Sequence, residues 1–421
     1  MLIKNIAGII GLWQGEPYLR GHDADKIKIV ENAWLRVCDG KIADYGNMET
    51  FPADCEAEET IDAEGALVLP SFCDSHTHLV YPESRAGEFL DKINGLSYEE
   101  IAARGGGILN SADKVADISE DALFRSALSR LNEVMAMGTG AIEIKSGYGL
   151  SLEGELKMLR VIARLADSVD IPVVATFLGA HAVGRAFAGR QAEYVDHVIN
   201  TMIPAVAAEG LAKYVDVFCD RGFFTPDETA RILEAGARYG MRPKIHGNEL
   251  DVSGGVETAV AHGALSVDHL ERAEVEQLAL LGNSDTVATM LPGASFFLGM
   301  PYGDARKALD SNAIVALASD FNPGSSPSGD MRFVWALGCI KMRLTPVQAL
   351  NAVTLNGAFA MGCEQTCGAI GKGRSANFIL TRRLVDNDRP SHPEALALLT
   401  EIPYRYTRPW IRHHFINGKK F

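Results

Sequence analysis

Two histidines, one residue apart, follow an apolar run near residue 70 of this 421-residue sequence. The stretch reads CDSHTHL over residues 73–79, two residues after ALVLP. Side chains two apart on a β-strand point to the same side, so His76 and His78 would project together. A lone buried histidine is usually a hydrogen-bonded core residue, but a pair at a strand end indicates metal binding.

Three more residues with metal-binding side chains end separate apolar runs later in the chain. They are His246 in KIHGNE, His269 in SVDHLE and Asp320 in ALASDFNPG. Neutral imidazoles with one carboxylate suit zinc or iron and leave a position open for water. We therefore predict one metal ion, Zn²⁺ or Fe²⁺/Fe³⁺, held by His76, His78, His246 and Asp320.

The position of the lysines favours one ion over two. Hydrolase barrels with two ions often bridge them with a carboxylated lysine at the end of the fourth strand. Here the fourth apolar run ends VFCD, without a lysine. Lys145, in EIKSG, belongs to the second run and is interpreted as a barrel or ion-pair lysine.

Glu249 and His269 are the candidates for proton transfer, with Asp320 as a third catalytic residue. Glu249 follows His246 by three residues, and a carboxylate beside an activated water can carry a proton to a leaving nitrogen. The plainer interpretation is a surface glutamate in a loop. His269 is either a further imidazole ligand or, as we favour, a hydrogen-bond partner of the attacking water or the developing oxyanion.

Other residues near these strand ends are candidates for substrate binding. An arginine shortly after the H-x-H pair can hold a carboxylate through two parallel hydrogen bonds, although it can also be an ordinary surface residue. Aromatic and imidazole side chains end the second and third runs, and a loop of small residues follows the last run. The predicted substrate-binding residues are Arg85, Tyr148, His181, Glu249, Asn322, Gly324 and Ser325.

Eight apolar, β-branched runs are the expected strands that position these residues. Helix-period stretches separate most of them, and one, TPDETARILEAGARYG, opens with a good helix start. This alternation predicts an α/β fold, a (β/α)8 TIM-type barrel whose active site lies at the C-terminal ends of the strands. A doubly wound sheet is the alternative, but its glycine-rich first turn is missing. The runs cover residues 66–76, 140–146, 171–181, 214–220, 242–249, 264–270, 285–291 and 313–320.

The two ends of the chain and the segment after the first run have a different character. Both ends contain short β-type segments broken by glycine and by Asp-Gly or Asn-Gly turns. They predict a small composite β-sandwich domain of residues 1–65 and 366–421, beside a barrel of residues 66–365. Residues 79–139 are expected to form a loop-and-helix insertion over the barrel mouth.

Composition narrows the classes of partner and the compartment. Apolar residues make up 47% and charged residues 22%, as in soluble globular enzymes. The net charge of −14 argues against nucleic acid or an anionic membrane as partner. Seven cysteines without a regular framework, no secretion signal and no apolar run of roughly 20 residues predict a soluble, cytoplasmic protein.

The motifs together resemble the imidazolonepropionase family of the amidohydrolase superfamily. The resemblance covers residues 73 to about 328 in the right order, and EIKSGYGL, GGGI and DFNPGSSP are its most specific parts. It implies metal-dependent hydrolysis of the cyclic amide 4-imidazolone-5-propanoate to N-formimidoyl-L-glutamate in histidine degradation, by a homodimer. The further matching stretches are DSHTHLVY, SRAGEF, SYEEIAARGGGI, FLGAHAV, KIHGNELDVSGG, ALSVDHLE and MLPGASFFL.

The resemblance implies the same site residues as the spacing does. The metal ligands would be the four residues predicted above, and Arg85 would hold the propionate carboxylate. Tyr148 and His181 would lie near the ring, Glu249 and His269 would handle protons and the attacking water, and the loop after the last run would complete the pocket.

Two other functions remain open at this point. A mononuclear aminohydrolase that deaminates a heterocyclic base would share the metal site and the glutamate, but it gives no reason for Arg85. A non-catalytic barrel would use the metal structurally or to bind a ligand. Structural zinc sites usually draw their ligands from compact motifs, whereas these ligands come from distant strands.

Overall fold

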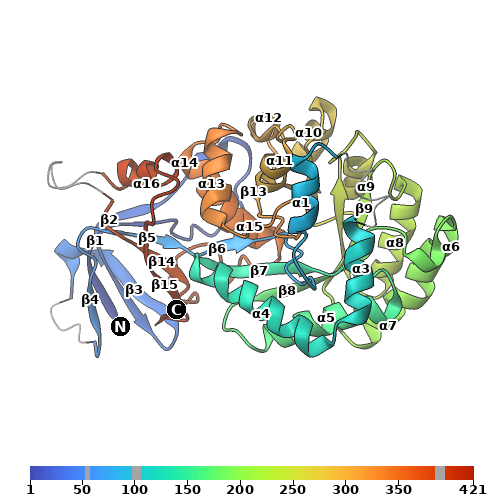
Figure 1. Ribbon diagram of the computed structural model, residues 1–421. Coiled ribbons are helices and arrows are strands. Elements are labelled where there is room, and N and C mark those ends of the chain that lie inside the picture. Colours follow the sequence, from blue (N-terminus) through green and yellow to red (C-terminus); the bar gives the residue numbers. More distant parts are fainter. Residues whose placement is uncertain (53–56, 97–105, 385–393) are drawn as a thin grey trace.

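The computed structural model describes residues 1–52, 57–96, 106–384 and 394–421. Two sheets dominate it, a parallel barrel sheet and a mixed sheet to which both ends of the chain contribute (Figure 1). Both termini lie on the side of the mixed sheet. The predicted barrel with a flanking β domain is confirmed.

The barrel is built from eight parallel strands that neighbour one another in chain order. Two hydrogen bonds join its first and last segments, from the His78 amide to the Phe321 carbonyl (2.9 Å) and from the Asp320 amide to the His76 carbonyl (3.0 Å). Each of the eight predicted runs overlaps one of these strands. They are β6 (Phe72–Asp74), β7 (Thr139–Lys145), β8 (Val173–Ala180), β9 (Tyr214–Cys219), β10 (Arg242–Gly247), β11 (Ser266–His269), β12 (Val287–Met290) and β13 (Val315–Leu317).

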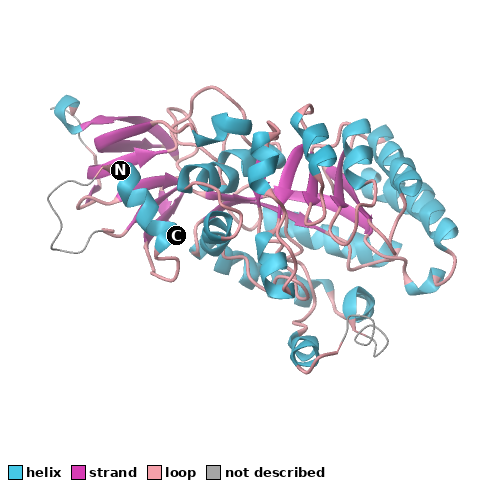
Figure 2. Ribbon diagram, turned by 90° about the horizontal axis from the view of Figure 1, so that it is seen from above, coloured by secondary structure: helices cyan, strands magenta, loops and turns pink. Residues whose placement is uncertain are grey.

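Helices pack around the outside of these strands, as the view from above shows (Figure 2). The Thr-Pro-Asp-Glu start predicted for one of them is present, because Thr225 and Glu228 form a capping box at the start of α8. The α-helices between β7 and β14 are α5 (Leu152–Ala166), α6 (Gln191–His197), α7 (Ile203–Ala208), α8 (Pro226–Arg238), α9 (Gly255–Ala261), α10 (Val275–Gly282), α11 (Pro292–Leu298), α12 (Ala305–Asp310), α13 (Met331–Ile340), α14 (Pro346–Val353) and α15 (Leu355–Ala360).

The long connection between β6 and β7 contains three described helices. They are α1 (Ala86–Ile93), α3 (Gly107–Asp117) and α4 (Glu120–Ala136). The helix α4 packs on α5 and β7 as part of the barrel wall, whereas α1 and the start of α3 bring side chains to the mouth of the barrel. Residues 97–105, most of the motif SYEEIAARGGGI, lie outside the described residues.

The flanking sheet has its own apolar core, separate from that of the barrel. Its hairpins turn at Asp39–Gly40 and Asn417–Gly418, where all four residues have positive φ, as a tight two-residue turn requires. The helix α16 (Ala395–Tyr404) contacts β1 and β5 of this sheet. The strands are β1 (Leu2–Ile10), β2 (Ile29–Cys38), β3 (Lys41–Asn47), β4 (Thr60–Asp62), β5 (Leu67–Pro70), β14 (Phe378–Thr381), β15 (Ile411–Ile416) and β16 (Lys419–Lys420).

The run at 66–76 differs from the expected single barrel strand. Its first part, β5, pairs with β1 and β14 of the flanking sheet, and only its second part, β6, pairs with β7 in the barrel. The chain therefore passes from the flanking sheet to the barrel at Ser71, whereas the sequence predicted this boundary between residues 65 and 66. A continuous buried apolar run gives no sign of a change of partner, because each half is covered on both faces.

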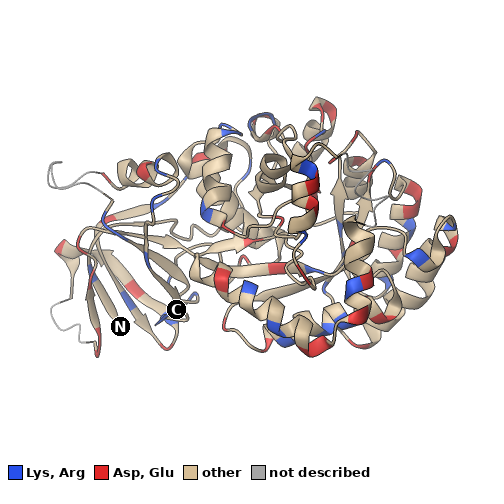
Figure 3. Cartoon of the chain, in the orientation of Figure 1, with Lys and Arg blue, Asp and Glu red and all other residues tan. Residues whose placement is uncertain are grey.

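His414 links the flanking sheet to the barrel. Its ring contacts the Ser71 hydroxyl through Nε2 (2.8 Å) and donates from Nδ1 to the carbonyl of Met135 at the end of α4 (2.7 Å). On the outer helices, acidic and basic residues are interspersed (Figure 3). Among the described helices, none combines the length and the apolar character that a membrane span demands.

Candidate active site

Four predicted metal ligands converge at the C-terminal ends of the barrel strands. His78 Nε2 lies 3.2 Å from His246 Nε2. Asp320 Oδ1 lies 3.6 Å from His76 Nε2 and 3.7 Å from His78 Nε2. Ligand atoms of His76, His78 and Asp320 all lie within 4.8 Å of one another, and so do those of His76, His246 and His269. The four predicted ligands come from the ends of three strands, β6, β10 and β13, and His269 comes from the end of a fourth, β11.

The donor atoms of these residues fit a metal ion. His76 donates from Nδ1 to Asp268 (2.6 Å), and His246 donates from Nδ1 to Asp216 (3.1 Å), because a carboxylate can only accept. Each neutral ring therefore presents the lone pair of Nε2 to the site. His76 Nε2 is buried and has no hydrogen-bond partner, which is costly unless an ion takes the lone pair.

The charge state of the rings also suits a metal. Burial lowers the pKa of His76, His78 and His246 well below the usual range, and the neighbouring Lys145 ammonium and histidines lower it further. The three imidazoles are therefore neutral at pH 7. A neutral imidazole is the form that binds a metal.

Glu249 lies against His269 at the edge of this group. The Glu249 carboxylate is 3.5 Å from His269 Nε2, and Glu271 is 3.5 Å from His269 Nδ1. Burial raises the pKa of Glu249 to about 7, although His269 opposes the shift. Burial alone would lower the pKa of His269, but Glu249 and Glu271 raise it to about 10. The pair can hold and release a proton close to neutral pH.

Asp220, at the end of β9, fixes the loop that carries Glu249. Its carboxylate accepts hydrogen bonds from the amides of Glu249 (2.8 Å), Leu250 (2.9 Å) and Asp251 (3.2 Å). Three amides on one buried carboxylate hold the loop in a single conformation.

A cavity of about 860 Å³ opens onto the four strand ends. It is large enough for a small-molecule substrate. Three of the predicted metal ligands, His78, His246 and Asp320, line it, whereas His76 does not. All predicted substrate-binding residues line it as well: Arg85, Tyr148, His181, Glu249, Asn322, Gly324 and Ser325.

Arg85 points into the cavity from the residue before α1. Its side chain is 9% exposed, and its Nε is buried without a hydrogen-bond partner. Its ion pair is with Glu88 at 3.8 Å, too long for a hydrogen bond. Lys92 is half-buried nearby and donates to the Gly324 carbonyl (3.3 Å). This corner of the cavity therefore has positive charge and free donors for an anion.

Tyr148 and His181 lie side by side on another wall of the cavity, with ring centroids 5.5 Å apart. The loop of Tyr148 is held by the buried Glu155, which accepts hydrogen bonds from the amides of Gly147, Gly149 and Leu150 (3.1, 2.8 and 2.9 Å). A Cβ at Gly149 would overlap the backbone at the start of α5. The second glycine of KSGYG is therefore required by close packing.

The loop after β13 is organised by Asn322. Its Oδ1 accepts from the amides of Gly324 and Ser325, both at 2.8 Å, and its Nδ2 donates to the Asp320 carbonyl (2.7 Å). Ser325 in turn donates to the Asp320 carboxylate (3.2 Å). The side-chain amide of Asn322 thus stabilises the turn through these hydrogen bonds. The same loop holds Asp320 in place.

Sequence reasoning missed several residues that the structure brings to the site. Asp216 and Asp268 orient His246 and His76, Glu271 flanks His269, and Lys92 lies beside Arg85. An aspartate inside an otherwise apolar strand, as in YVDVF and SVDH, is the sign that could have revealed the first two.

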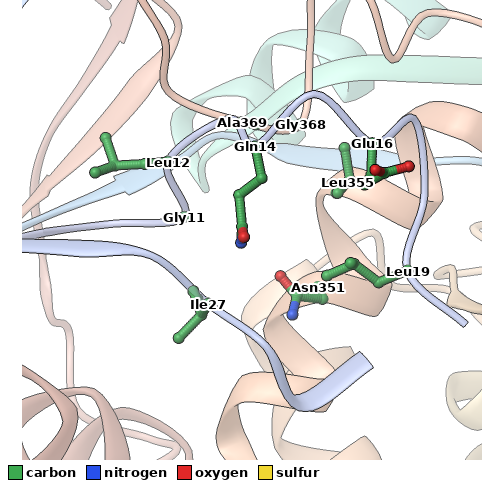
Figure 4. Close-up of a pocket in the computed structure, with 10 residues that line it drawn as sticks. All are labelled: Gly11, Leu12, Gln14, Glu16, Leu19, Ile27, Asn351, Leu355, Gly368 and Ala369. Carbon is green, nitrogen blue, oxygen red and sulfur yellow. The ribbon is translucent and has the colours of Figure 1, made fainter. Parts of the chain in front are cut away.

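A second hollow lies between the N-terminal segment and the helices α14 and α15 (Figure 4). Its volume is about 20 Å³, room for a water molecule. Figure 4 shows Gln14 and Asn351 beside it. It is too small for a substrate.

Comparison with known proteins assigns the chain to a family. The sequence model of the Amidohydrolase family matches residues 155–420. The imidazolonepropionase of Christiangramia forsetii is 49% identical over 420 residues, covering 100% of this chain and 99% of that protein. The imidazolonepropionase of Flavobacterium johnsoniae is 46% identical, covering 99% of each chain. The chain belongs to the imidazolonepropionase family.

Members of the wider amidohydrolase group have the same fold. Escherichia coli guanine deaminase superposes with a TM-score of 0.73 at 13% identity, covering 100% of this chain and 98% of that one. A mutant of the atrazine chlorohydrolase of Arthrobacter aurescens, in complex with zinc and atraton, gives a TM-score of 0.73 at 15% identity, with coverage of 100% and 94%. At such low identity the likeness concerns the barrel and its flanking sheet.

Proposed function

We propose that this protein hydrolyses the cyclic amide 4-imidazolone-5-propanoate to N-formimidoyl-L-glutamate in histidine degradation. The relatives named imidazolonepropionase, at up to 49% identity over the whole chain, support this activity. The observation that carries the choice of substrate is Arg85, whose nearly buried guanidinium faces the cavity with an unpaired Nε. A carboxylate on the substrate would satisfy it.

The metal site would hold one zinc or iron ion through His76, His78, His246 and Asp320. When bound, the ion supplies Lewis acidity, which activates water and polarises the ring carbonyl. The buried Nε2 of His76 without a partner, and the two aspartates that turn the histidine rings, support this assignment. The structural neighbour with bound zinc is consistent with it.

Glu249 and His269 would carry the proton transfers. Glu249 takes a proton from the attacking water and passes it to the ring nitrogen as the carbon–nitrogen bond breaks, because its raised pKa lets it do both near pH 7. His269, held between Glu249 and Glu271, donates a hydrogen bond to the developing oxyanion.

The other cavity residues would bind and orient the substrate. Arg85 holds the propionate carboxylate through parallel hydrogen bonds, and Lys92, which donates to the Gly324 carbonyl, adds a second positive charge. Tyr148 and His181 contact the ring, and the loop of Asn322, Gly324 and Ser325 closes the pocket. The cavity should therefore bind ligands without a carboxylate poorly, because they leave the buried Arg85 guanidinium unpaired.

The test is the decay of the imidazolone ultraviolet absorbance when enzyme is mixed with freshly generated 4-imidazolone-5-propanoate. We expect decay to formimidoylglutamate that a chelator abolishes and added Zn²⁺ or Fe²⁺ restores. A metal-loaded protein that leaves the imidazolone intact but releases ammonia from a heterocyclic base would instead be a deaminase. A cytoplasmic location, a homodimeric assembly and the absence of nucleic-acid and membrane partners stay predictions from the sequence.

A further inference from the structure

A layer of five charged side chains inside the barrel adjoins the candidate metal site, and only its two aspartates, which orient metal-ligand histidines, have a place in the proposed function. Its members are Lys145, Lys244, Glu143, Asp216 and Asp268, and all are at most 1% exposed. Lys244 and Asp216 are paired in the register of β10 and β9, and Lys244 lies two residues before His246 on the same strand. The layer is therefore directly adjacent to the metal ligands.

Lys145 is the centre of this layer. Its ammonium lies 2.7 Å from Glu143, 2.8 Å from Asp216 and 3.3 Å from Asp268. It thus joins carboxylates from three strands, β7, β9 and β11. Lys244 contacts the other oxygen of Glu143 and lies 4.0 Å from Asp268.

Two of the carboxylates that Lys145 joins are the ones that orient metal ligands. Asp216 accepts from Lys145 with Oδ2 and from both the backbone amide and Nδ1 of His246 with Oδ1. Asp268 uses a single oxygen, Oδ2, to accept from His76 and to contact Lys145. Any shift of the ammonium would therefore move both histidine rings.

The charge balance of the layer also depends on Lys145. Three carboxylates with two ammonium groups leave one negative charge, which the N–H groups of two imidazoles share. Without Lys145, three carboxylates would face a single ammonium in a dry interior and would repel one another. Removing the lysine would thus release the two aspartates from their positions.

We propose that Lys145 is a positioning residue that, through Asp216 and Asp268, locks His246 and His76 with their Nε2 atoms directed at the metal ion. This role rests on the metal site of the proposed function. Lys145 was interpreted from the sequence as a barrel or ion-pair lysine. In this proposal it also couples two metal ligands, His76 and His246, which lie 170 residues apart in sequence.

The test is the affinity of the metal-free protein for Zn²⁺, measured by competition with a chromophoric chelator. Lys145→Met should weaken Zn²⁺ binding about 10- to 100-fold, the usual effect of losing a residue behind the ligands. Thr289→Val is the matched control, because Thr289 is buried in β12 and its hydroxyl has no hydrogen-bond partner. It should bind Zn²⁺ as wild type does. Near-ultraviolet circular dichroism establishes that each variant is folded.

Each outcome is informative. A folded Lys145→Met variant with wild-type affinity would overturn the positioning role and leave the proposed function standing. If Lys145→Met does not fold, Lys145→Gln decides, since a neutral amide keeps polar contacts but not the charge; wild-type affinity there would also overturn the role. Failure of the wild-type protein itself to bind Zn²⁺ or Fe²⁺ would refute the metal site and the proposed function together.

Discussion

The guanidinium of Arg85 lies directly against the Cα of Gly324. A Cβ at position 324 would overlap the guanidinium, so the two residues fit only because one of them has no side chain. This contact places the proposed carboxylate-binding arginine between α1 and the loop after β13. The loop also holds Asp320, so the carboxylate subsite and the metal site are parts of one structure.

Gly324→Ala should displace Arg85 without touching the proposed metal ligands. We expect KM for the imidazolone substrate to rise at least 10-fold, with metal content unchanged. Steady-state kinetics and metal analysis check this. Gly87→Ala is the matched control in the same region, because a Cβ there meets nothing within 4 Å, and it should behave as wild type.

Arg85→Met should weaken substrate binding more than turnover. Loss of one partner of a buried charge pair costs about 2 kcal/mol or more, which is roughly 30-fold or more in kcat/KM. The loss should appear mainly in KM. An unchanged kcat/KM would remove Arg85 from the recognition of the carboxylate.

Glu249→Gln should retain the metal but lose turnover, because the amide cannot accept a proton from water. We expect kcat to fall about 10²- to 10⁴-fold. Asp251→Asn, two residues along the same loop, should retain activity, since its carboxylate pairs with the exposed Arg221. Full activity of Glu249→Gln would place the proton transfer elsewhere.

His414 should make stability depend on pH at the junction of the two sheets. Burial lowers its pKa to about 4 in the folded protein, although the bond to the Met135 carbonyl opposes the shift. Between its unfolded value of about 6.5 and pH 4, the unfolded chain therefore binds a proton that the folded protein does not. The free energy of unfolding should fall as pH drops through this window, by roughly 3 kcal/mol at most from this residue.

Urea unfolding of wild type and His414→Gln between pH 7 and 5 measures this contribution. The variant should lose less stability on acidification than wild type does. His22→Gln, at an exposed position, should follow the wild-type slope. Parallel curves for wild type and His414→Gln would show that the ring does not titrate on unfolding.

The sequence by itself determined the barrel and the residues at its mouth. Strand periodicity places His76 and His78 on one side, and the common direction of parallel strands brings His246, His269 and Asp320 to the same end. These are local properties of short runs, so they can be read without knowing which runs are neighbours. The arginine and the loop of small residues could be named for the same reason, by their distance in sequence from a strand end.

Tertiary structure alone decided how those residues are held. Lys145 meets Asp216 and Asp268 only because β7, β9 and β11 curve around one barrel interior, and no local pattern encodes that meeting. The division of the run at 66–76 between two sheets likewise depends on pairing with β1, β14 and β7, all distant in sequence. Residue types and spacing fix which groups reach the site, whereas the partners that set their orientation and charge are fixed by long-range packing.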